Sequence, residues 1–324
     1  MKTKTLCIAG GSGFVGLHLA TEALKAGYRV RVVTRGRAAC RRLLVLPQVE
    51  IAEVPTQNFH TLCEAFSGAH AVVNLVGILN ESGDDGRQFE KVHVGLAGTL
   101  AEAARAAGVR RYLHMSALRA APQGPSHYLQ SKGRGEARVH ALHGDGFAVT
   151  SLRPSVIFGP EDRFLNRFAD LLRLSPWVFP LTCARARFQP VYVGDVVATF
   201  LRALVDPRAV GGRFDVVGPE VLRLYDIVAY VQRLIGTGQT ILTPCDRHSR
   251  MVAEVMEHVP GKPFSRDNFR SCQIDNVWVG EHPMQTALGR HQTSLDAVVP
   301  AYLGARVVSH RYDRLREVAR RGIH

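Results

Sequence analysis

The feature that most constrains this chain is a glycine-rich turn between a short apolar segment and a helix-like one. Residues 5–9 are mostly apolar, and residues 17–26 have the composition of a helix. Between them lie Gly10, Gly11, Ser12, Gly13, Phe14, Val15 and Gly16. In a strand–turn–helix unit, the first glycine permits a tight turn, the second lets backbone approach a pyrophosphate, and the third lets the helix pack closely. The segment predicts a phosphate site on the free N–H groups of a helix start. The alternative is a tight turn without a ligand.

The first part of the chain alternates between strand and helix patterns. We predict strands at 5–9, 29–34, 49–54, 71–75 and 111–115. We predict helical segments at 13–26, 59–66 and 89–107, and a short turn at 38–46. Such alternation is typical of an α/β fold, a Rossmann-type doubly wound parallel sheet, with a ligand over the carboxyl ends of the strands.

The length of 324 residues predicts one main domain with a smaller mixed α/β C-terminal domain. We place the dinucleotide-binding domain at 1–217, with 161–185 contributing to the small domain, the small domain at 218–303 and a basic tail at 304–324. No apolar run reaches the roughly 18 residues that span a bilayer. Four glycines interrupt the apolar region after Met1, which favours a first strand over a signal peptide.

Charge and cysteine usage narrow the function classes. The net charge is +13, but no nucleic-acid motif is present and aromatic residues are only 7%, so we expect no nucleic-acid partner. The six cysteines include no CxxC pair, which favours small buried residues in a reducing, cytoplasmic compartment. Four histidines (248, 258, 282 and 291) lack metal-ligand spacing, and we expect no metal site.

The end of the second predicted strand indicates which dinucleotide binds. Enzymes that prefer NAD place an acidic residue there to hold the ribose 2′-hydroxyl. This chain has Arg35 and Arg37 instead, and guanidinium groups suit a 2′-phosphate. We therefore expect NADP(H) to be preferred over NAD(H); solvated surface arginines are the alternative.

A second chemical element is Tyr128 followed four residues later by Lys132. On a helix these residues share a face. A nearby ammonium group favours the phenolate, so we expect it to lower the pKa of the tyrosine and make it a general acid/base. Alone, this spacing is common on helix surfaces. Its position after the glycine turn and several strand–helix units favours the catalytic interpretation.

Together these segments resemble the short-chain dehydrogenase/reductase superfamily in its extended form, also known as epimerase/dehydratase-like, over residues 4–303. The resemblance implies cofactor contacts at Asn74, Leu75, Val76 and Gly77, and at Met115, Lys132, Pro154 and Val156. It also implies catalytic roles for Tyr128, Lys132 and Ser116, with the lysine holding the nicotinamide ribose.

Several further segments, including 92–94, 115–118 and 275–277, resemble an atypical subgroup named after the nucleotide-binding accessory subunit of respiratory complex I. Members keep the glycine turn and the Tyr/Lys pair but typically lack the rest of the catalytic tetrad. Here the tetrad asparagine position holds His93, and the tetrad serine position holds Ala117. A missing preorganised donor typically lowers a rate by about 10²–10³, so cofactor binding is better supported than fast turnover.

Two function classes remain open. One is an NADP(H)-dependent oxidoreductase, or a sugar-nucleotide epimerase/dehydratase, acting on an unidentified small molecule. The other is a non-catalytic cofactor-binding scaffold for a respiratory or quinone-pathway partner. The apolar face of 251–259 predicts packing on the Rossmann core, with a membrane-surface or quinone-facing role as alternative. The tail has six arginines and two acidic residues after residue 304, which suits weak contact with the inner face of an anionic membrane; a solvated terminus is the alternative.

Overall fold

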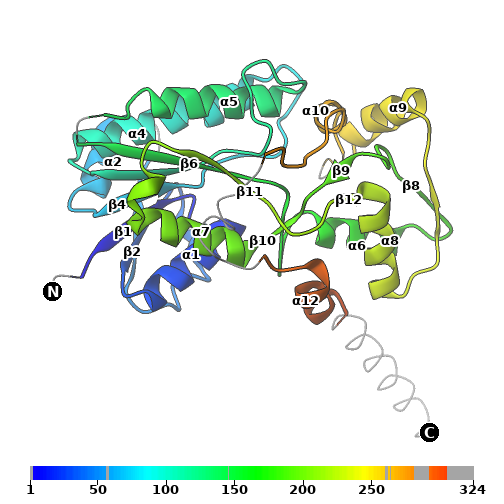
Figure 1. Cartoon of the computed structure of the whole chain (residues 1–324), viewed down its shortest axis with the longest axis horizontal. Coiled ribbons are helices and arrows are strands. Elements are labelled where there is room, and N and C mark those ends of the chain that lie inside the picture. Colours follow the sequence, from blue (N-terminus) through cyan, green and yellow to red (C-terminus); the bar gives the residue numbers. More distant parts are fainter. Residues whose placement is uncertain are drawn as a thin grey trace, which may run out of the picture.

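The computed structural model describes residues 3–55, 58–144, 146–259, 262, 264–280 and 292–304. The predicted basic tail lies outside these residues, as do His282 and His291. Figure 1 shows a larger sheet-containing half joined to a smaller half that carries α6, α8 and α9.

Seven parallel strands form the main sheet, in the order β11-β6-β5-β4-β1-β2-β3. They are β1 (Thr5–Ala9), β2 (Arg29–Thr34), β3 (Val49–Glu53), β4 (Ala71–Asn74), β5 (Arg111–Met115), β6 (Ala148–Pro154) and β11 (Arg213–Val216). The predicted α/β class and five strand positions are confirmed, with ends that differ by at most one residue. The chain reverses its direction of travel between β1 and β4. In doubly wound sheets, ligands bind in the crevice at this switch point.

Helices cover both faces of the sheet, which is why its central strands are apolar on both sides. One face carries α1 (Phe14–Lys25) and α7 (Val193–Val205), which share a core through Leu19 and Phe200. The other face carries α2 (Phe59–Phe66), α4 (Ala97–Ala106) and α5 (His127–His140). Figure 1 shows α1 and α7 below the sheet and α4 and α5 above it.

Two predicted segments of this half differ from expectation. The helix predicted at 89–107 is divided into α3 (Arg87–Phe89), a π-helical turn η2 (Glu90–Leu96) and α4. At this turn α5 approaches so closely that a Cβ on Gly135 would lie 1.9 Å from the carbonyl oxygen of His93. The turn predicted at 38–46 is a short 3₁₀ helix, η1 (Arg37–Cys40).

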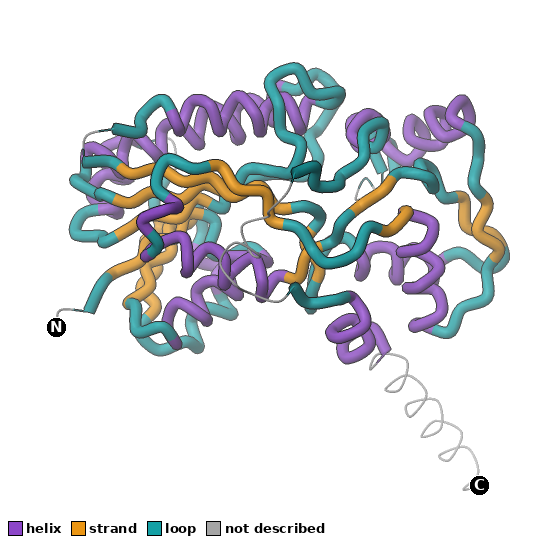
Figure 2. Tube along the Cα trace, in the orientation of Figure 1, coloured by secondary structure: helices purple, strands orange, loops and turns teal. Residues whose placement is uncertain are grey.

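The smaller half combines residues before and after β11 around its own apolar core. Its core includes Phe158, Leu165, Leu172, Ile227 and Val231. Its elements, together with the short segments that connect it to the sheet, are β7 (Ile157–Phe158), α6 (Leu165–Leu174), β8 (Val178–Pro180), β9 (Arg187–Phe188), β10 (Val191–Tyr192), η3 (Pro207–Ala209), β12 (Leu222–Arg223), α8 (Leu224–Ile235), β13 (Thr240–Leu242), α9 (Asp246–Glu257), α10 (Arg266–Ser271), α12 (Leu295–Val299) and η4 (Pro300–Gly304). Figure 2 shows the short strands at its centre with helices around them.

The predicted helix at 251–259 begins earlier, as α9, and packs against α10. Its side chains Met251 and Val255 are about 60% exposed, so the expectation that they pack on the Rossmann core was wrong. Cys245, just before α9, is also exposed, contrary to the expectation of buried cysteines, whereas Cys7 and Cys40 are buried.

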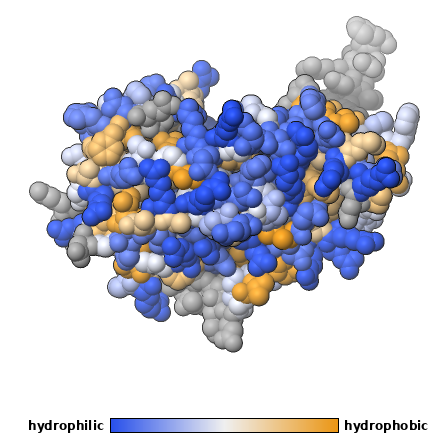
Figure 3. Space-filling view, turned by 90° about the horizontal axis from the view of Figure 1, so that it is seen from above, coloured by the Kyte–Doolittle hydropathy of each residue, from blue (hydrophilic) through white to orange (hydrophobic). Residues whose placement is uncertain are grey.

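The surface is largely polar on the face seen in Figure 3, where hydrophobic residues form small separate groups. Within the described part of the chain, no helix combines the length and the apolar character needed to cross a bilayer.

Candidate functional site

The glycine turn places three glycines in three different environments. Gly10 has a φ of 82°, and a Cβ there would lie 3.0 Å from backbone atoms of Leu75 and Val76. A Cβ on Gly16 would lie 2.5 Å from the Gly10 carbonyl oxygen, so α1 packs directly on the turn. A Cβ on Gly13 would meet only that same oxygen, at 3.3 Å. Gly10 and Gly16 are therefore needed for packing, whereas Gly13, at the start of α1, has one backbone oxygen close to its Cβ position and otherwise lines a cleft.

A small cleft opens beside Gly13 at the N-terminal end of α1. Its lining residues are Ser12, Gly13, Phe14, Leu17, Ala39, Arg42, Leu43, Glu161 and Arg163. Arg42 forms an ion pair with Glu161 across this cleft. Sequence reasoning did not single out Arg42 or Arg163. The basic run from Arg35 to Arg42 could have indicated Arg42. Arg163 lies in the loop between β7 and α6, far along the chain, and no local pattern indicated it.

Arg35 and Arg37 follow the carboxyl end of β2 and are both exposed. In the described part of the chain, neither side chain forms a hydrogen bond or ion pair. Their guanidinium groups therefore remain available to an anion at this end of the sheet.

The end of β4 brings backbone close to Lys132. Asn74 is buried, and its Oδ1 accepts a hydrogen bond from the Val76 N–H at 2.9 Å. This contact shapes the turn that leads to Gly77. A Cβ on Gly77 would lie 3.2 Å from Lys132 Nζ and 3.5 Å from His93 Nε2. The predicted segment 74–77 therefore lies against the predicted catalytic lysine.

Lys132 is almost fully buried, and its Nζ donates to the carbonyl oxygen of Met115 at 3.1 Å. Burial lowers the pKa of Lys132 to about 8, although the carboxylate of Glu136 opposes the shift. Glu136 itself accepts hydrogen bonds from Arg153 of β6 through both of its carboxylate oxygens, which ties α5 to the sheet. Lys132 is therefore an amine with a defined position at the carboxyl end of β5.

His93 occupies the position where the resemblance implied an asparagine. Its Nε2 accepts a hydrogen bond from the Ile78 N–H at 3.1 Å. Its Nδ1 therefore carries the proton and donates to Ser131 Oγ at 2.9 Å, and Ser131 donates in turn to the Tyr128 carbonyl oxygen. Burial and the nearby Lys132 hold the pKa of His93 far below its ordinary value. His93 is therefore a neutral side chain that links the backbone at Ile78 to α5.

Tyr128 lies in the first turn of α5, half-buried, with its ring 5.5 Å from that of His93 and 5.8 Å from that of Phe89. Burial, and next the carboxylate of Asp267, raise the pKa of Tyr128 to about 12. The expectation that Lys132 lowers this pKa was therefore wrong. Desolvation of the ring and, after it, a negative neighbour determine the direction of the shift.

Ser116 follows β5 and is buried, and within the described residues its Oγ has no hydrogen-bond partner. Ala117 stands in the next position and offers no polar group. Pro154 ends β6, and its carbonyl oxygen accepts from the Leu118 N–H at 2.9 Å. Val156 follows it and is half-buried. These residues lie at the carboxyl ends of β5 and β6, where the resemblance implied the nicotinamide end of the cofactor.

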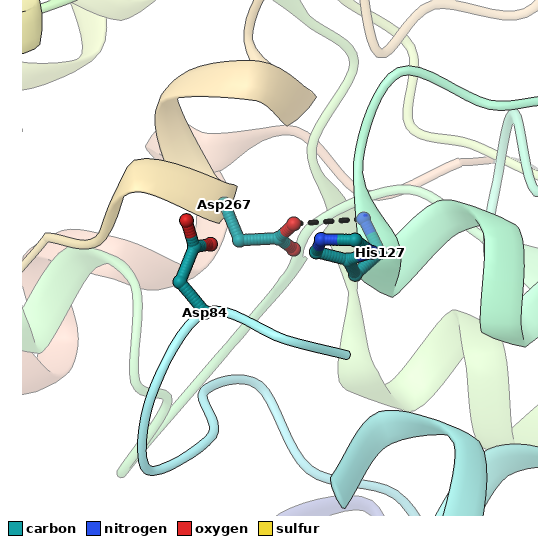
Figure 4. A group of neighbouring side chains, drawn as sticks. All are labelled: Asp84, His127 and Asp267. Atoms are coloured by element: carbon teal, nitrogen blue, oxygen red, sulfur yellow. Dashed lines mark hydrogen bonds between the residues drawn. The ribbon is translucent and has the colours of Figure 1, made fainter. Parts of the chain in front are cut away.

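Asp84, His127 and Asp267 form a cluster of potential metal ligands beside α5 (Figure 4). Both carboxylates already have partners. Asp267 accepts from the N–H groups of His127 and Tyr128, and Asp84 forms two 2.6 Å bonds with Arg270. A cation would have to compete with these donors, so the cluster is an ion-pair junction. Sequence reasoning did not find Asp267, because its partners lie about 140 residues earlier in the chain.

Comparisons of this chain with known proteins agree on the family to which it is related. The family model described as "NAD dependent epimerase/dehydratase family" matches residues 6–217. The mitochondrial NADH dehydrogenase [ubiquinone] 1 alpha subcomplex subunit 9 of Mus musculus is 32% identical over 232 residues, which cover 69% of this chain and 59% of the mouse protein. The match thus spans less than two thirds of that relative.

A bacterial enzyme is also similar. The ceramide reductase of Caulobacter vibrioides is 31% identical over 193 residues, which cover 60% of this chain and 58% of the enzyme. Among solved structures, a short-chain dehydrogenase/reductase superfamily protein from Agrobacterium tumefaciens with bound NAD has a TM-score of 0.68. It is 19% identical and covers 98% of this chain and 99% of its own. The chain therefore belongs to the NAD dependent epimerase/dehydratase family.

Proposed function

We propose that this protein binds NADP(H) and reduces a carbonyl group, with Tyr128 as the proton donor. The observation that supports this most directly is the arrangement of Gly77, Lys132 and Tyr128. A backbone segment at the switch point of the sheet lies against a buried amine, and the phenol stands one helical turn away on the same helix. The glycine turn lies at the carboxyl end of the adjacent strand β1.

The residues fit a dinucleotide along this edge. Gly13 lines a cleft at the start of α1, where a Cβ would meet only one backbone oxygen, and α1 begins there without a side-chain cap. These are the features that a pyrophosphate needs. Arg35 and Arg37 would hold a 2′-phosphate, and Lys132 would hold the nicotinamide ribose. When bound, the reduced dinucleotide supplies a hydride.

The side chains of this protein would handle the proton. With its pKa raised to about 12, Tyr128 is a phenol at neutral pH and can donate its proton to a carbonyl oxygen. His93 holds the first turn of α5 through Ser131. Ala117 supplies no second donor to the carbonyl, so we expect turnover to be slow.

The relatives indicate a substrate class and an alternative. The Caulobacter relative is named a ceramide reductase, and another relative, from Stigmatella aurantiaca, is named as a ketoreductase of a farnesyl-bearing quinoline oxide. Both names describe large apolar substrates, so we propose a lipid-like ketone. The alternative is a cofactor-binding scaffold in the cytoplasm or at the membrane, with a respiratory or quinone-pathway partner. The relationship to complex I subunits and the alanine at position 117 favour that second possibility.

The test is NADPH oxidation, followed at 340 nm, with a panel of long-chain ketones and, separately, UDP-sugars. We expect ketone-dependent oxidation in the parent protein and its loss in Tyr128→Phe, with NADPH affinity almost unchanged. Tyr225→Phe, at an exposed site on α8, is the matched control and should retain full activity. NADPH binding without oxidation by any ketone would favour the scaffold. Conversion of a UDP-sugar without net oxidation would favour an epimerase.

A further inference from the structure

The cleft beside the glycine turn is lined by segments that are far apart in the sequence. Gly13 and Phe14 come from the start of α1, and Arg42 follows η1. Glu161 and Arg163 come from the loop between β7 and α6. Among the described residues that line the cleft, Glu161 alone is acidic. A single carboxylate therefore lies among guanidinium groups, at the place where the cofactor phosphates are expected.

Glu161 stands on a well-anchored turn that packs against the first residue of α1. Residues 159–162 form this turn, which is closed by a 3.0 Å hydrogen bond from the Asp162 N–H to the Gly159 carbonyl oxygen. Asp162 is only 3% exposed, and its carboxylate accepts from three backbone N–H groups and a tyrosine hydroxyl. A Cβ on Gly159 would lie 3.2 Å from Phe14 Cζ. The turn therefore holds Glu161 close to the N-terminal end of α1.

The backbone conformation at Glu161 is one that glycine adopts more easily. Its φ is 71°, in the left-handed region. Proline in the second position and a positive φ in the third are typical of a type II turn, whose third position usually holds glycine or asparagine. Here Pro160 is second, and the third residue is a glutamate that forms an ion pair with Arg42. Because such backbone strain is concentrated at functional sites, we infer a role for the side chain at position 161.

The ion pair occupies a group that suits phosphate. The side chains of Arg42 and Glu161 are 62% and 52% exposed, so the pair can open easily, since exposed ion pairs are weak. Arg163 has no hydrogen-bond or ion-pair partner among the described residues. Two guanidinium groups beside the free N–H groups of a helix start favour a pair of linked phosphates. The carboxylate of Glu161 holds one of these guanidinium groups and would repel the same anion.

We propose that Glu161 is an internal competitor of the dinucleotide: its carboxylate holds the Arg42 guanidinium that the pyrophosphate of the bound cofactor takes over. This inference rests on the proposed function, because it assumes a dinucleotide at the glycine turn. Binding then exchanges one anion for another on Arg42, which lowers the affinity and favours release of the cofactor. Since NADH and NADPH both contain the pyrophosphate, Glu161 lowers the affinity for both, whereas Arg35 acts on the choice between them.

Calorimetric titration of the full chain with NADPH and, separately, with NADH tests this competition. Glu161→Gln should tighten the binding of both cofactors by about fivefold, the most that an exposed ion pair usually contributes. The control is Glu102→Gln, which removes a carboxylate from the exposed ion pair with Arg138 on the other face of the sheet. It should change either affinity by less than about twofold. Unchanged or weaker binding in Glu161→Gln would overturn the proposal, as would a gain confined to NADPH, which would assign Arg42 to the 2′-phosphate.

A double-variant cycle tests whether Glu161 acts through Arg42. Arg42→Gln should weaken the binding of both cofactors by about fivefold, because the loss of a charge-assisted hydrogen bond is partly offset by the loss of the competing pair. Adding Glu161→Gln to Arg42→Gln should change the affinity by less than about twofold. An equal gain from Glu161→Gln in both backgrounds would mean that the carboxylate acts by general repulsion, which would contradict the proposal.

A second substitution keeps the proposal testable if Glu161→Gln disturbs the turn. Glu161→Gly places the usual residue at this φ, so it should keep or raise the urea midpoint and tighten the binding of both cofactors as Glu161→Gln does. Loss of affinity in this variant would overturn the proposal. Tighter binding without ketone-dependent oxidation would support the competition and refute the reductase. Absence of binding in the parent and in every variant would refute both.

Discussion

Two regions of the molecule are held together in opposite ways. One is the glycine turn of residues 10–16, which we call the cradle. The other is the contact of Asp84, Asp267, Arg266 and Arg270 with one another and with α5, which we call the junction. At the cradle, backbone atoms approach one another directly, and a Cβ on Gly10 or Gly16 would collide with backbone. At the junction, charged side chains connect the two parts, with Asp84 bound by Arg270 and Arg266 and with Asp267 on the amides of α5. The cradle consists mainly of residues 10–16, although Gly10 also meets the backbone of Leu75 and Val76, whereas the junction pairs residues up to 186 positions apart.

This contrast suggests a division of labour. A cradle made of backbone presents a rigid surface to the phosphates of a dinucleotide, which all members of a cofactor class share. A junction made of side chains can change at a lower cost to the fold than a packed backbone turn. We therefore expect substitutions at the cradle to act strongly on folding or on cofactor binding, and substitutions at the junction to cost less stability.

The largest effects on folding and on cofactor binding are expected at Gly16 and Gly13, where an added Cβ would meet very different surroundings. Gly16→Val places a branched side chain on backbone atoms only 2.5 Å away, so it should destabilise the fold by about 3 kcal/mol or more. A Cβ on Gly13 would meet a single backbone oxygen, at 3.3 Å, so Gly13→Val should cost much less stability than Gly16→Val while abolishing NADPH binding. Urea denaturation and calorimetric titration measure the two properties. Equal stability of both variants would show that the packing of α1 on the turn is not rigid.

Lys132 gives a pH dependence with a definite sign. Its pKa falls from 10.5 to about 8 on folding, so between these values the unfolded chain binds more protons and stability rises with pH. The free energy of unfolding of the parent, minus that of Lys132→Met, should increase by up to about 3 kcal/mol from pH 8 to pH 10.5. A difference that stays constant or decreases over this range would contradict the burial of a charged lysine.

Cofactor choice should respond to Arg35. Arg35→Asp removes a guanidinium and adds a charge that repels a 2′-phosphate, so NADPH affinity should fall by about 10–150-fold, or about 1.5–3 kcal/mol. NADH affinity should change much less. Arg29→Asp, at the opposite end of the same strand and also exposed, is the control and should leave both affinities unchanged. Equal dissociation constants for the two cofactors in the parent would refute the NADP(H) preference.

The smallest effect is expected at the junction. Arg270→Ala removes both bonds to Asp84, whose side chain is 12% exposed, and should cost about 1–2 kcal/mol because Arg266 remains as a partner. Arg173→Ala removes the ion pair with the exposed Asp170 and should cost no more than about 0.5 kcal/mol. Equal losses in chemical denaturation would remove the distinction between the junction and an ordinary surface pair.

The sequence predicted the cradle well because the glycine spacing and the alternation of strands and helices are local properties. Gly77 and Lys132 were also named from the sequence, and the structure brings them together. The sequence did not predict the pKa direction of Tyr128, since this depends on burial and on Asp267, which lies about 140 residues further along the chain. It also missed the π-helical turn at His93, because the close approach of Gly135 that accompanies it is a tertiary contact.

The central claim is that the cradle holds one dinucleotide, and native mass spectrometry tests it most directly. The full chain, purified without added ligand and then incubated with NADPH, should gain the mass of one NADP(H) per chain. Gly13→Val, still folded, should gain none. Absence of the bound cofactor in the parent, or equal binding by both proteins, would contradict the account.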